Sequence, residues 1–259
     1  MILEDELHTA YKFGNSSILT FPFPHLYVEN IFSDDFYSKI HENLLDPSEM
    51  ISLADLYSDN PLMSVYKDRM VMDFDKKESM LKVGKNKQKF WTSFYENFCP
   101  NFSNILRAKF KKFLDIRFAH LKNLSYTHTL QVVNDKKNYS LGPHTDQPSK
   151  VISLLIYLPK NRTQISTGTS IYMPKDPSKI NPELQHLHYP REDFYNVITM
   201  PYAPNSAFCF IKTNNSFHGV EKLEMEDTDR WSLQYNVHIT KDVVDQETAK
   251  RNEYRSKTK

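Results

Sequence analysis

The sequence predicts an α+β fold in which a mainly helical first half is followed by a β-rich second half. Apolar residues recur at helical spacing across residues 30–115, whereas short β-type runs separated by Pro, Gly, Asn and Asp turns fill the chain after residue 125. No Gly- or Ser-rich linker divides the two halves. We therefore expect one domain over residues 1–259, with the helices packed on the outside of an antiparallel sandwich or barrel.

A short strand and a capped helix follow a start at residues 1–20 that we interpret as loose. Residues 25–30 (HLYVEN) predict the strand. Ser33 has the character of a helix N-cap, because two aspartates follow it in the first turn and complement the helix dipole. Apolar residues at four-residue steps then predict a helix to about residue 45.

The remainder of the helical support region, which covers residues 20–125 in all, contains one more strand and two more helices. Residues 69–74 predict the strand. The run 76–89 carries six lysines against one glutamate and is interpreted as a solvated face, although it also has the charge to bind an anion. Apolar stripes at 91–98 and 105–114 predict core helices, with Pro100 breaking or restarting the helix between them.

The second half, residues 126–240, is predicted to form the sheet of the molecule. A long loop at residues 174–196 interrupts it and is a candidate lid over a substrate. The charged tail at 241–259 is interpreted as a peripheral helix or a partly disordered segment. The predicted strands are 127–133, 151–157, 169–173, 197–200, 207–211 and 231–239.

Composition excludes several classes of function. The formal net charge is +1, which argues against electrostatic capture of nucleic acid or of an acidic membrane. No apolar run is long enough to span a membrane, and the acidic N-terminus is no secretory signal. Cys99 and Cys209 alone form no disulfide framework, so a reducing, cytoplasmic location is expected. The five glycines form no phosphate-binding loop.

Two histidines and one aspartate have the composition of a metal site. His144 and Asp146 are two residues apart, so in an extended segment both side chains point to the same side. His218 follows a strand-like apolar run and precedes a glycine. Two imidazoles and a carboxylate can hold one face of a ferrous ion and leave the other positions open. A chance HxD pair and a hydrogen-bonded structural histidine are the alternatives to this interpretation.

The segment 230–239 alternates strictly between apolar and polar residues. Arg230, Ser232 and the three polar residues after them share one face of the predicted strand. This face is either the wet outer surface of an antiparallel sheet or the lining of a ligand cavity. In the second case Arg230 and Ser232 both reach one carboxylate, for which the planar guanidinium is suited.

In these segments the chain resembles the iron(II)- and 2-oxoglutarate-dependent oxygenases, which have a double-stranded β-helix (jelly-roll) core. The resemblance covers roughly residues 20–240 and is most specific in the second half. It rests on residues 21–28 (FPFPHLYV), 141–146 (LGPHTD), 151–158 (VISLLIYL), 168–169 (GT), 204–205 (PN) with the strand 207–211, 216–220 (SFHGV) and 230–233 (RWSL).

The resemblance implies roles for individual residues. His144, Asp146 and His218 would hold Fe(II), and Arg230 with help from Ser232 would bind the far carboxylate of 2-oxoglutarate. O2 would be the other co-substrate, and succinate and CO2 the co-products of a hydroxylation. Gln131 and Tyr139 are further candidates for the co-substrate pocket, because they lie just before the HxD pair.

The sequence leaves other interpretations open. A small molecule is the expected substrate, whereas the lysine run would favour a protein or nucleic acid. A non-catalytic cupin-like binding protein, or a zinc hydrolase with the same ligands, is also compatible with the pattern. His186 and His188 form a second HxH pair, which we interpret as loop residues because no other ligand completes a set around them.

Overall fold

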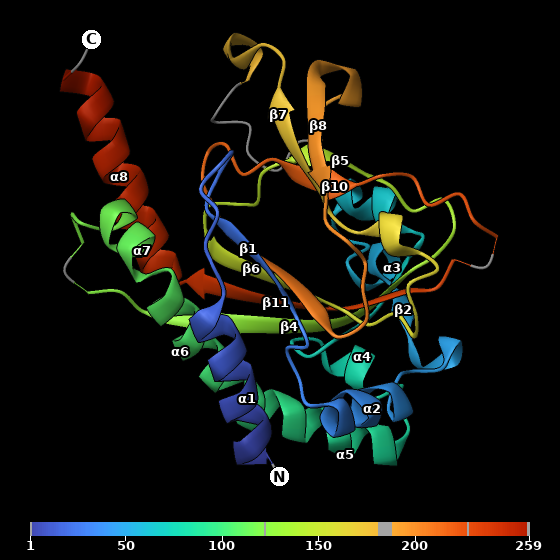
Figure 1. Ribbon diagram of the computed structural model, residues 1–259. Coiled ribbons are helices and arrows are strands. Elements are labelled where there is room, and N and C mark those ends of the chain that lie inside the picture. Colours follow the sequence, from blue (N-terminus) through green and yellow to red (C-terminus); the bar gives the residue numbers. More distant parts are fainter. Residues whose placement is uncertain (1, 122, 181–187, 227, 258–259) are drawn as a thin grey trace.

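Two antiparallel sheets form the centre of the computed structural model, which describes residues 2–121, 123–180, 188–226 and 228–257 (Figure 1). The larger sheet has the strand order β1 (His25–Glu29), β9 (Ser206–Ile211), β6 (Lys150–Tyr157), β11 (Arg230–Ile239), β4 (Tyr126–Asp135), β3 (Arg69–Asp73) and β2 (Ile51–Ser52). The smaller sheet has the order β5 (Leu141–His144), β10 (His218–Val220), β7 (Ser170–Pro174) and β8 (Phe194–Thr199).

The path of the chain between these sheets is that of a double-stranded β-helix. From β4 onward the chain enters the larger sheet at β4, β6, β9 and β11 and the smaller sheet at β5, β7, β8 and β10. The two sheets therefore wind around a common interior, as in other jelly rolls. The predicted α+β jelly-roll class is confirmed.

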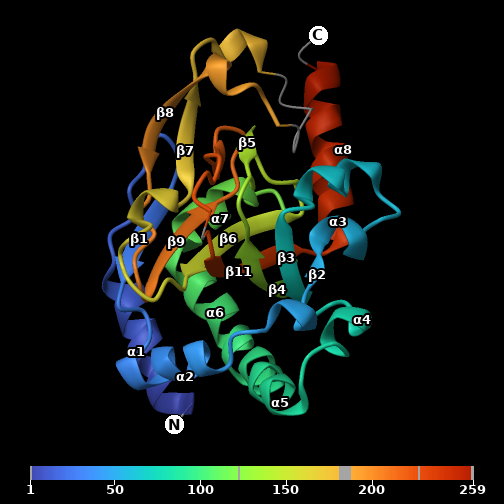
Figure 2. The same cartoon turned by 90° about the vertical axis from the view of Figure 1, so that its right-hand side faces the viewer.

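Helices cover the outer face of the larger sheet, as the sequence predicted (Figures 1 and 2). Aromatic rings of the helices pack against this face; Phe102, for example, lies 5.6 Å from the ring of Tyr235 in β11. Leu53 and Leu56 in the short helix α3 pack instead against Val71 and Val133, on the face that Ser232 shares. No helix in the described part of the chain is long and apolar enough to cross a membrane. The helices are α1 (Ile2–Asn15), α2 (Asp34–Glu42), α3 (Leu53–Leu56), α4 (Lys77–Met80), α5 (Lys85–Ser93), α6 (Cys99–Lys109), α7 (Lys111–Arg117) and α8 (Lys241–Lys257).

The predicted features of the helical region are largely present. Ser33 caps α2, since its Oγ accepts a hydrogen bond from the backbone N–H of Phe36 at 3.2 Å. Pro100 restarts the helix, because it lies in the first turn of α6, directly after one π-helical turn at Phe94–Phe98. Cys99 and Cys209 are buried and form no disulfide.

The prediction of a loose start was wrong, because the segment forms α1. Its packing explains the helix: Phe13 is fully buried, and its ring meets Phe102 of α6 edge-on at 6.4 Å. The hydroxyl of Thr9 donates to the carbonyl of Ile31 at 2.9 Å. These long-range contacts stabilise a helix of fourteen residues that would be marginal alone.

The predicted strands are present, but β5, β10 and β2 were missed. Gly142 and Pro143, residue types that are common in turns, both lie in β5. Because β5 is an edge strand, the missing N–H of the proline costs no hydrogen bond to a second neighbour. The predicted loop 174–196 is also shorter than expected, because β8 begins at Phe194 rather than at residue 197.

Gly168→Ala is expected to destabilise the fold by about 3 kcal/mol, which corresponds to a fall in Tm of roughly 8 °C. A Cβ at this position would lie 1.8 Å from the backbone O of Met200, and backbone cannot move aside as a flexible side chain can. Thermal unfolding measures the effect. The matched control is Gly14→Ala in α1, where a Cβ meets nothing within 4 Å and helix propensity predicts a small gain in stability. Equal Tm values for the two variants would contradict the prediction.

Candidate active site

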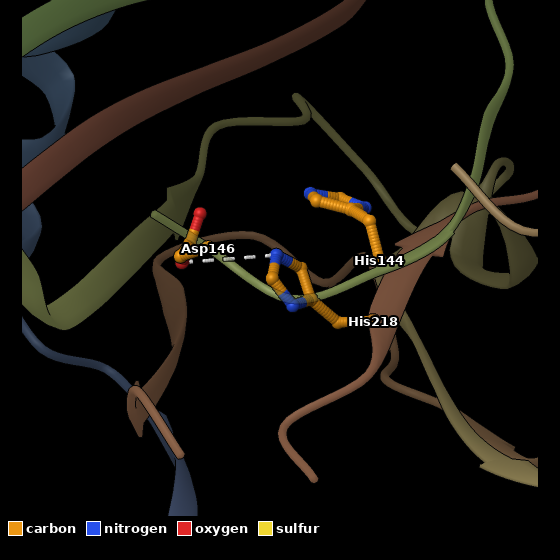
Figure 3. Close-up of side chains that lie close together, drawn as sticks. All are labelled: His144, Asp146 and His218. Atoms are coloured by element: carbon orange, nitrogen blue, oxygen red, sulfur yellow. Dashed lines mark ion pairs between the residues drawn. The ribbon is translucent and has the colours of Figure 1, made fainter. Parts of the chain in front are cut away.

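Three buried side chains of the predicted metal site lie together at the junction of β5 and β10 (Figure 3). His218 is the antiparallel partner of His144, and their rings are 4.4 Å apart. Asp146 follows β5, and its Oδ2 lies 4.0 Å from Nε2 of His218. One ligand atom from each residue lies within 4.8 Å of the others. The set can therefore converge on a single ion, as a two-histidine, one-carboxylate triad does.

The backbone selects the histidine tautomers that metal binding requires. Nδ1 of His144 lies 3.0 Å from the carbonyl O of Gly142, and Nδ1 of His218 lies 2.9 Å from that of Ser216. A carbonyl oxygen only accepts, so each Nδ1 carries the proton and donates it. Each Nε2 then has a free lone pair to offer to a metal.

Asp146 is oriented by two donors that the sequence did not identify as site residues. Lys150 donates to its Oδ1 at 2.8 Å and Ser153 donates to its Oδ2 at 2.7 Å. Burial alone would raise the pKa of Asp146, but Lys150 and the two histidines outweigh burial, and the pKa falls well below its usual range. The carboxylate is therefore ionised at neutral pH.

Burial lowers the pKa of both histidines, and in His144 the neighbouring His218 lowers it further. Both imidazoles are therefore neutral at pH 7. Neutral imidazole and ionised carboxylate are the protonation states in which these groups bind a metal.

A cavity of about 640 Å³ adjoins the triad. The polar face of β11 lines it, so the cavity interpretation of this strand is confirmed and the interpretation as a wet outer surface is wrong. Arg230 and Ser232 are 2% and 1% exposed. Another part of the wall comes from the segment after β2, including Tyr57, Met63 and Tyr66.

The Arg230 end of the cavity has unused hydrogen-bonding capacity. Nε of Arg230 donates to the carbonyl of Thr167 and Nη1 to Asp135, both at 2.6 Å. Nη2 forms no hydrogen bond with any described residue. Oγ of Ser232 and Oγ1 of Thr169 are buried in the cavity wall and also find no partner there. Buried hydroxyls are rarely left unpaired, so this end of the cavity fits a ligand with an acceptor such as a carboxylate.

Gln131 and Tyr139 have different surroundings. Gln131 lines the cavity, but its amide donates to Asp73 at 2.7 Å, on the β3 side. Tyr139 is 1% exposed and packs with Leu141, and its ring lies 4.4 Å from the guanidinium of Arg69. Its hydroxyl is buried without a hydrogen-bond partner among the described residues, and Tyr139 is not among the residues that line the cavity.

The loop that was predicted to be a lid reaches the site. The backbone N–H of Tyr189 donates to the carbonyl of Pro143 at 2.8 Å, which fixes the end of the loop on β5. His188 lies with its ring 5.0 Å from that of His144 and its Nε2 3.1 Å from the hydroxyl of Tyr66. It is a loop residue, as predicted, and His186 lies outside the described residues.

No residue of the lysine run 76–89 lines the wall of the cavity. Lys87 pairs with Asp46 and Glu49, each at 2.8 Å. Lys76 lies 4.6 Å above the ring of Tyr57. Contacts within the fold thus account for two of these side chains.

No family model and no curated protein matches the chain. Structural neighbours are 2-oxoglutarate- and iron-dependent oxygenases. One is a prolyl 4-hydroxylase from Phytophthora capsici, with 13% sequence identity and a TM-score of 0.49. The match covers 92% of this chain and 66%, just under two thirds, of that protein's chain. A 2OG-Fe(II) oxygenase family protein from Burkholderia pseudomallei has 12% identity and a TM-score of 0.46, and the match covers 90% of this chain and 89% of the other. A prolyl hydroxylase from Trichoplax adhaerens has 11% identity and a TM-score of 0.49, and the match covers 95% of this chain and 94% of the other.

Proposed function

We propose that this protein is an iron(II)- and 2-oxoglutarate-dependent oxygenase that hydroxylates a C–H bond of a small molecule. The observation that carries the proposal is the position of two complementary sites on one cavity. A buried, correctly protonated His–Asp–His set lies beside the cavity, and an arginine with two unpaired hydroxyls lines it. A dicarboxylate that chelates a metal at one end needs such an anchor at the other.

The residues of the chain divide the work between holding the metal and holding the co-substrate. Iron(II) with 2-oxoglutarate supplies the activation of O2, coupled to decarboxylation to succinate and CO2 and to oxidation of the substrate. Nε2 of His144, Nε2 of His218 and one oxygen of Asp146 would hold the metal. The Nη2 of Arg230 and the Ser232 hydroxyl would bind the far carboxylate.

Thr169 adds a third donor to this proposed anchor, and apolar neighbours would keep water away from it. The rings of Phe210 and His218 lie 4.4 Å apart, and Phe210 and Leu155 both line the cavity. An apolar wall that excludes water lowers the local dielectric constant and thereby strengthens the attraction between a guanidinium and a carboxylate. These residues therefore favour binding of the co-substrate in one orientation.

The size of the cavity supports a small molecule as the substrate. Its volume of about 640 Å³ lies within the range of ligand pockets. Tyr57, Met63 and Tyr66 also line the cavity and are not among the proposed metal- or co-substrate-binding residues. Aromatic and thioether side chains suit a partly apolar substrate.

Succinate formation from 2-oxoglutarate tests the proposal. The purified protein with Fe(II) is expected to release succinate slowly alone and faster with an accepted substrate from a panel of small molecules. Binding of 2-oxoglutarate to the Mn(II)-loaded protein, measured by titration calorimetry, gives a readout that does not depend on turnover. A folded protein that neither binds 2-oxoglutarate nor turns it over would overturn the proposal. Ligand affinity that survives Arg230→Ala would favour a cupin-like binding protein instead.

A further inference from the structure

Two arginines on different strands share one buried aspartate beside the cavity. Arg69 opens β3, Asp135 ends β4 and Arg230 opens β11, and the register places Asp135 opposite both arginines. Arg69 and Arg230 are 5% and 2% exposed, and Asp135 is fully buried. The three charges therefore lie together out of contact with bulk water, and both arginines line the cavity.

The geometry distinguishes the two arginines. Arg69 binds Asp135 with two nitrogens, Nε to Oδ1 at 2.6 Å and Nη2 to Oδ2 at 3.1 Å. Its Nη1 lies within reach of the side-chain amide of Gln234, and its Cζ lies over the ring of Tyr139, 4.4 Å from the centroid. Arg230 donates to Asp135 through Nη1 alone, at 2.6 Å. Arg69 thus uses all its nitrogens within the wall, whereas Nη2 of Arg230 has no hydrogen-bond partner among the described residues.

The set has a net charge of +1. Neither guanidinium forms an ion pair with any other carboxylate in the part of the chain that the structure describes. With Asp135 alone, Arg230 would belong to a neutral pair and would have little attraction for an anion. Arg69 supplies the second positive charge, so one charge remains uncompensated at the wall where Ser232 and Thr169 lack partners.

An excess buried charge needs an explanation, because a fold gains nothing from it. Burying an ion without a counter-ion is costly, and natural proteins pair such charges. Burial by itself would lower the pKa of Arg69, but Asp135 outweighs burial and raises it, so Arg69 remains charged. An incoming carboxylate would bring the set to neutrality.

We propose that Arg69 is a positioning residue that creates the anion site at Arg230 without having to touch the anion. It neutralises Asp135 and thereby leaves the charge of Arg230 available for the far carboxylate of 2-oxoglutarate. This inference rests on the proposed function. It assigns to β3, outside the eight strands of the jelly roll, a part in co-substrate affinity.

Charge-removing variants of Arg69 test the inference. Calorimetric titration of Mn(II)-loaded Arg69→Gln with 2-oxoglutarate is expected to give a Kd roughly ten- to a hundredfold above that of the wild type, because one charge of a buried coupled set is lost. Arg69→Gln combined with Asp135→Asn restores the net charge to +1 and is expected to recover an affinity within about fivefold of the wild type. Arg69→Lys keeps the charge and is expected to retain most of the affinity.

Two further measurements separate charge from packing. The affinity for Mn(II) is expected to be unchanged in all these variants, since none of them alters the His–Asp–His set. Arg162→Gln is the matched control: it removes one positive charge from a side chain that is 59% exposed and paired with Glu29, and it is expected to bind 2-oxoglutarate as the wild type does.

The affinities of these variants for 2-oxoglutarate decide whether the charge of Arg69 creates the anion site. Wild-type affinity in Arg69→Gln would overturn the inference and leave the proposed function intact. A double variant as weak as Arg69→Gln would also overturn it, because packing rather than charge would then be the role of Arg69. If Arg69→Gln does not fold, Arg69→Lys and the double variant decide, and weak binding by either contradicts the charge argument. A wild-type protein that binds no 2-oxoglutarate overturns the proposed function itself.

Discussion

His218→Ala is expected to abolish turnover and to weaken metal binding by more than about a hundredfold, since changes to outer-shell residues alone cost ten- to a hundredfold. The variant removes one of three neutral or anionic donors that lie within 4.8 Å of one another. Only two ligands would remain, and His144 and Asp146 alone do not define one face of an octahedral ion. Titration calorimetry with Mn(II) and the succinate assay measure the two effects.

A matched control for this variant exists in β1. His25 is also buried, and its Nδ1 lies 2.8 Å from the carbonyl of Phe23, two residues before it, as Nδ1 of His218 lies beside Ser216. His25 does not line the cavity. His25→Ala is therefore expected to lose stability but to bind metal normally when folded. Succinate release by His218→Ala at the wild-type rate would show that the ligand assignment is wrong.

Arg230→Ala is expected to raise the KM for 2-oxoglutarate by roughly fiftyfold or more, with a smaller change in kcat. The reason is the loss of the Arg230 guanidinium, whose Nη2 lies beside the hydroxyls of Ser232 and Thr169 and, like them, has no partner in the part of the chain that the structure describes. Metal affinity is expected to remain, because Arg230 contacts none of the three proposed ligands. Steady-state kinetics over a range of 2-oxoglutarate concentrations measure the split between KM and kcat.

Two further variants separate the charge of Arg230 from its geometry and from the hydroxyl of Ser232. Arg230→Lys keeps the charge but loses the planar fork, so an intermediate KM is expected. Ser232→Ala removes a hydroxyl without a partner, so its effect on folding is small, and any rise in KM reports the contact with the co-substrate. A KM for 2-oxoglutarate that is the same in Arg230→Ala and the wild type would show that the far carboxylate binds elsewhere.

The candidate site was predictable where its residues are close in sequence or lie on one strand. The spacing of His144 and Asp146 needs only an extended backbone to place both side chains on one side. Strict alternation likewise predicts that Arg230 and Ser232 share a face of β11. The choice between an outer surface and a cavity wall depends on what covers that face, and this information lies in other segments of the chain.

Residues that act through pairing between distant strands were not predictable. Arg69 and Asp135 are 66 residues apart and meet because β3 and β4 are neighbours in the larger sheet. β10 contains only three residues, which is too few for a periodic pattern. The helix α1, which we predicted to be a loose segment, is stabilised by the contact of Phe13 with α6. Ser153 lies in the predicted strand 151–157 and Lys150 directly before it, but their common partner Asp146 was not foreseen.

The sequence by itself determined the α+β class, the common side of His144 and Asp146 and the polar face of β11, because local spacing and periodicity decide these features. The jelly-roll core and the third ligand, His218, were implied by the resemblance to the iron(II)- and 2-oxoglutarate-dependent oxygenases. The tertiary structure alone decided which groups surround them. It placed His218 opposite His144, selected the tautomers through two backbone carbonyls, and paired Asp135 with both Arg69 and Arg230. Those contacts join residues far apart in the chain, and their electrostatic effects depend on burial, which is a property of the folded molecule.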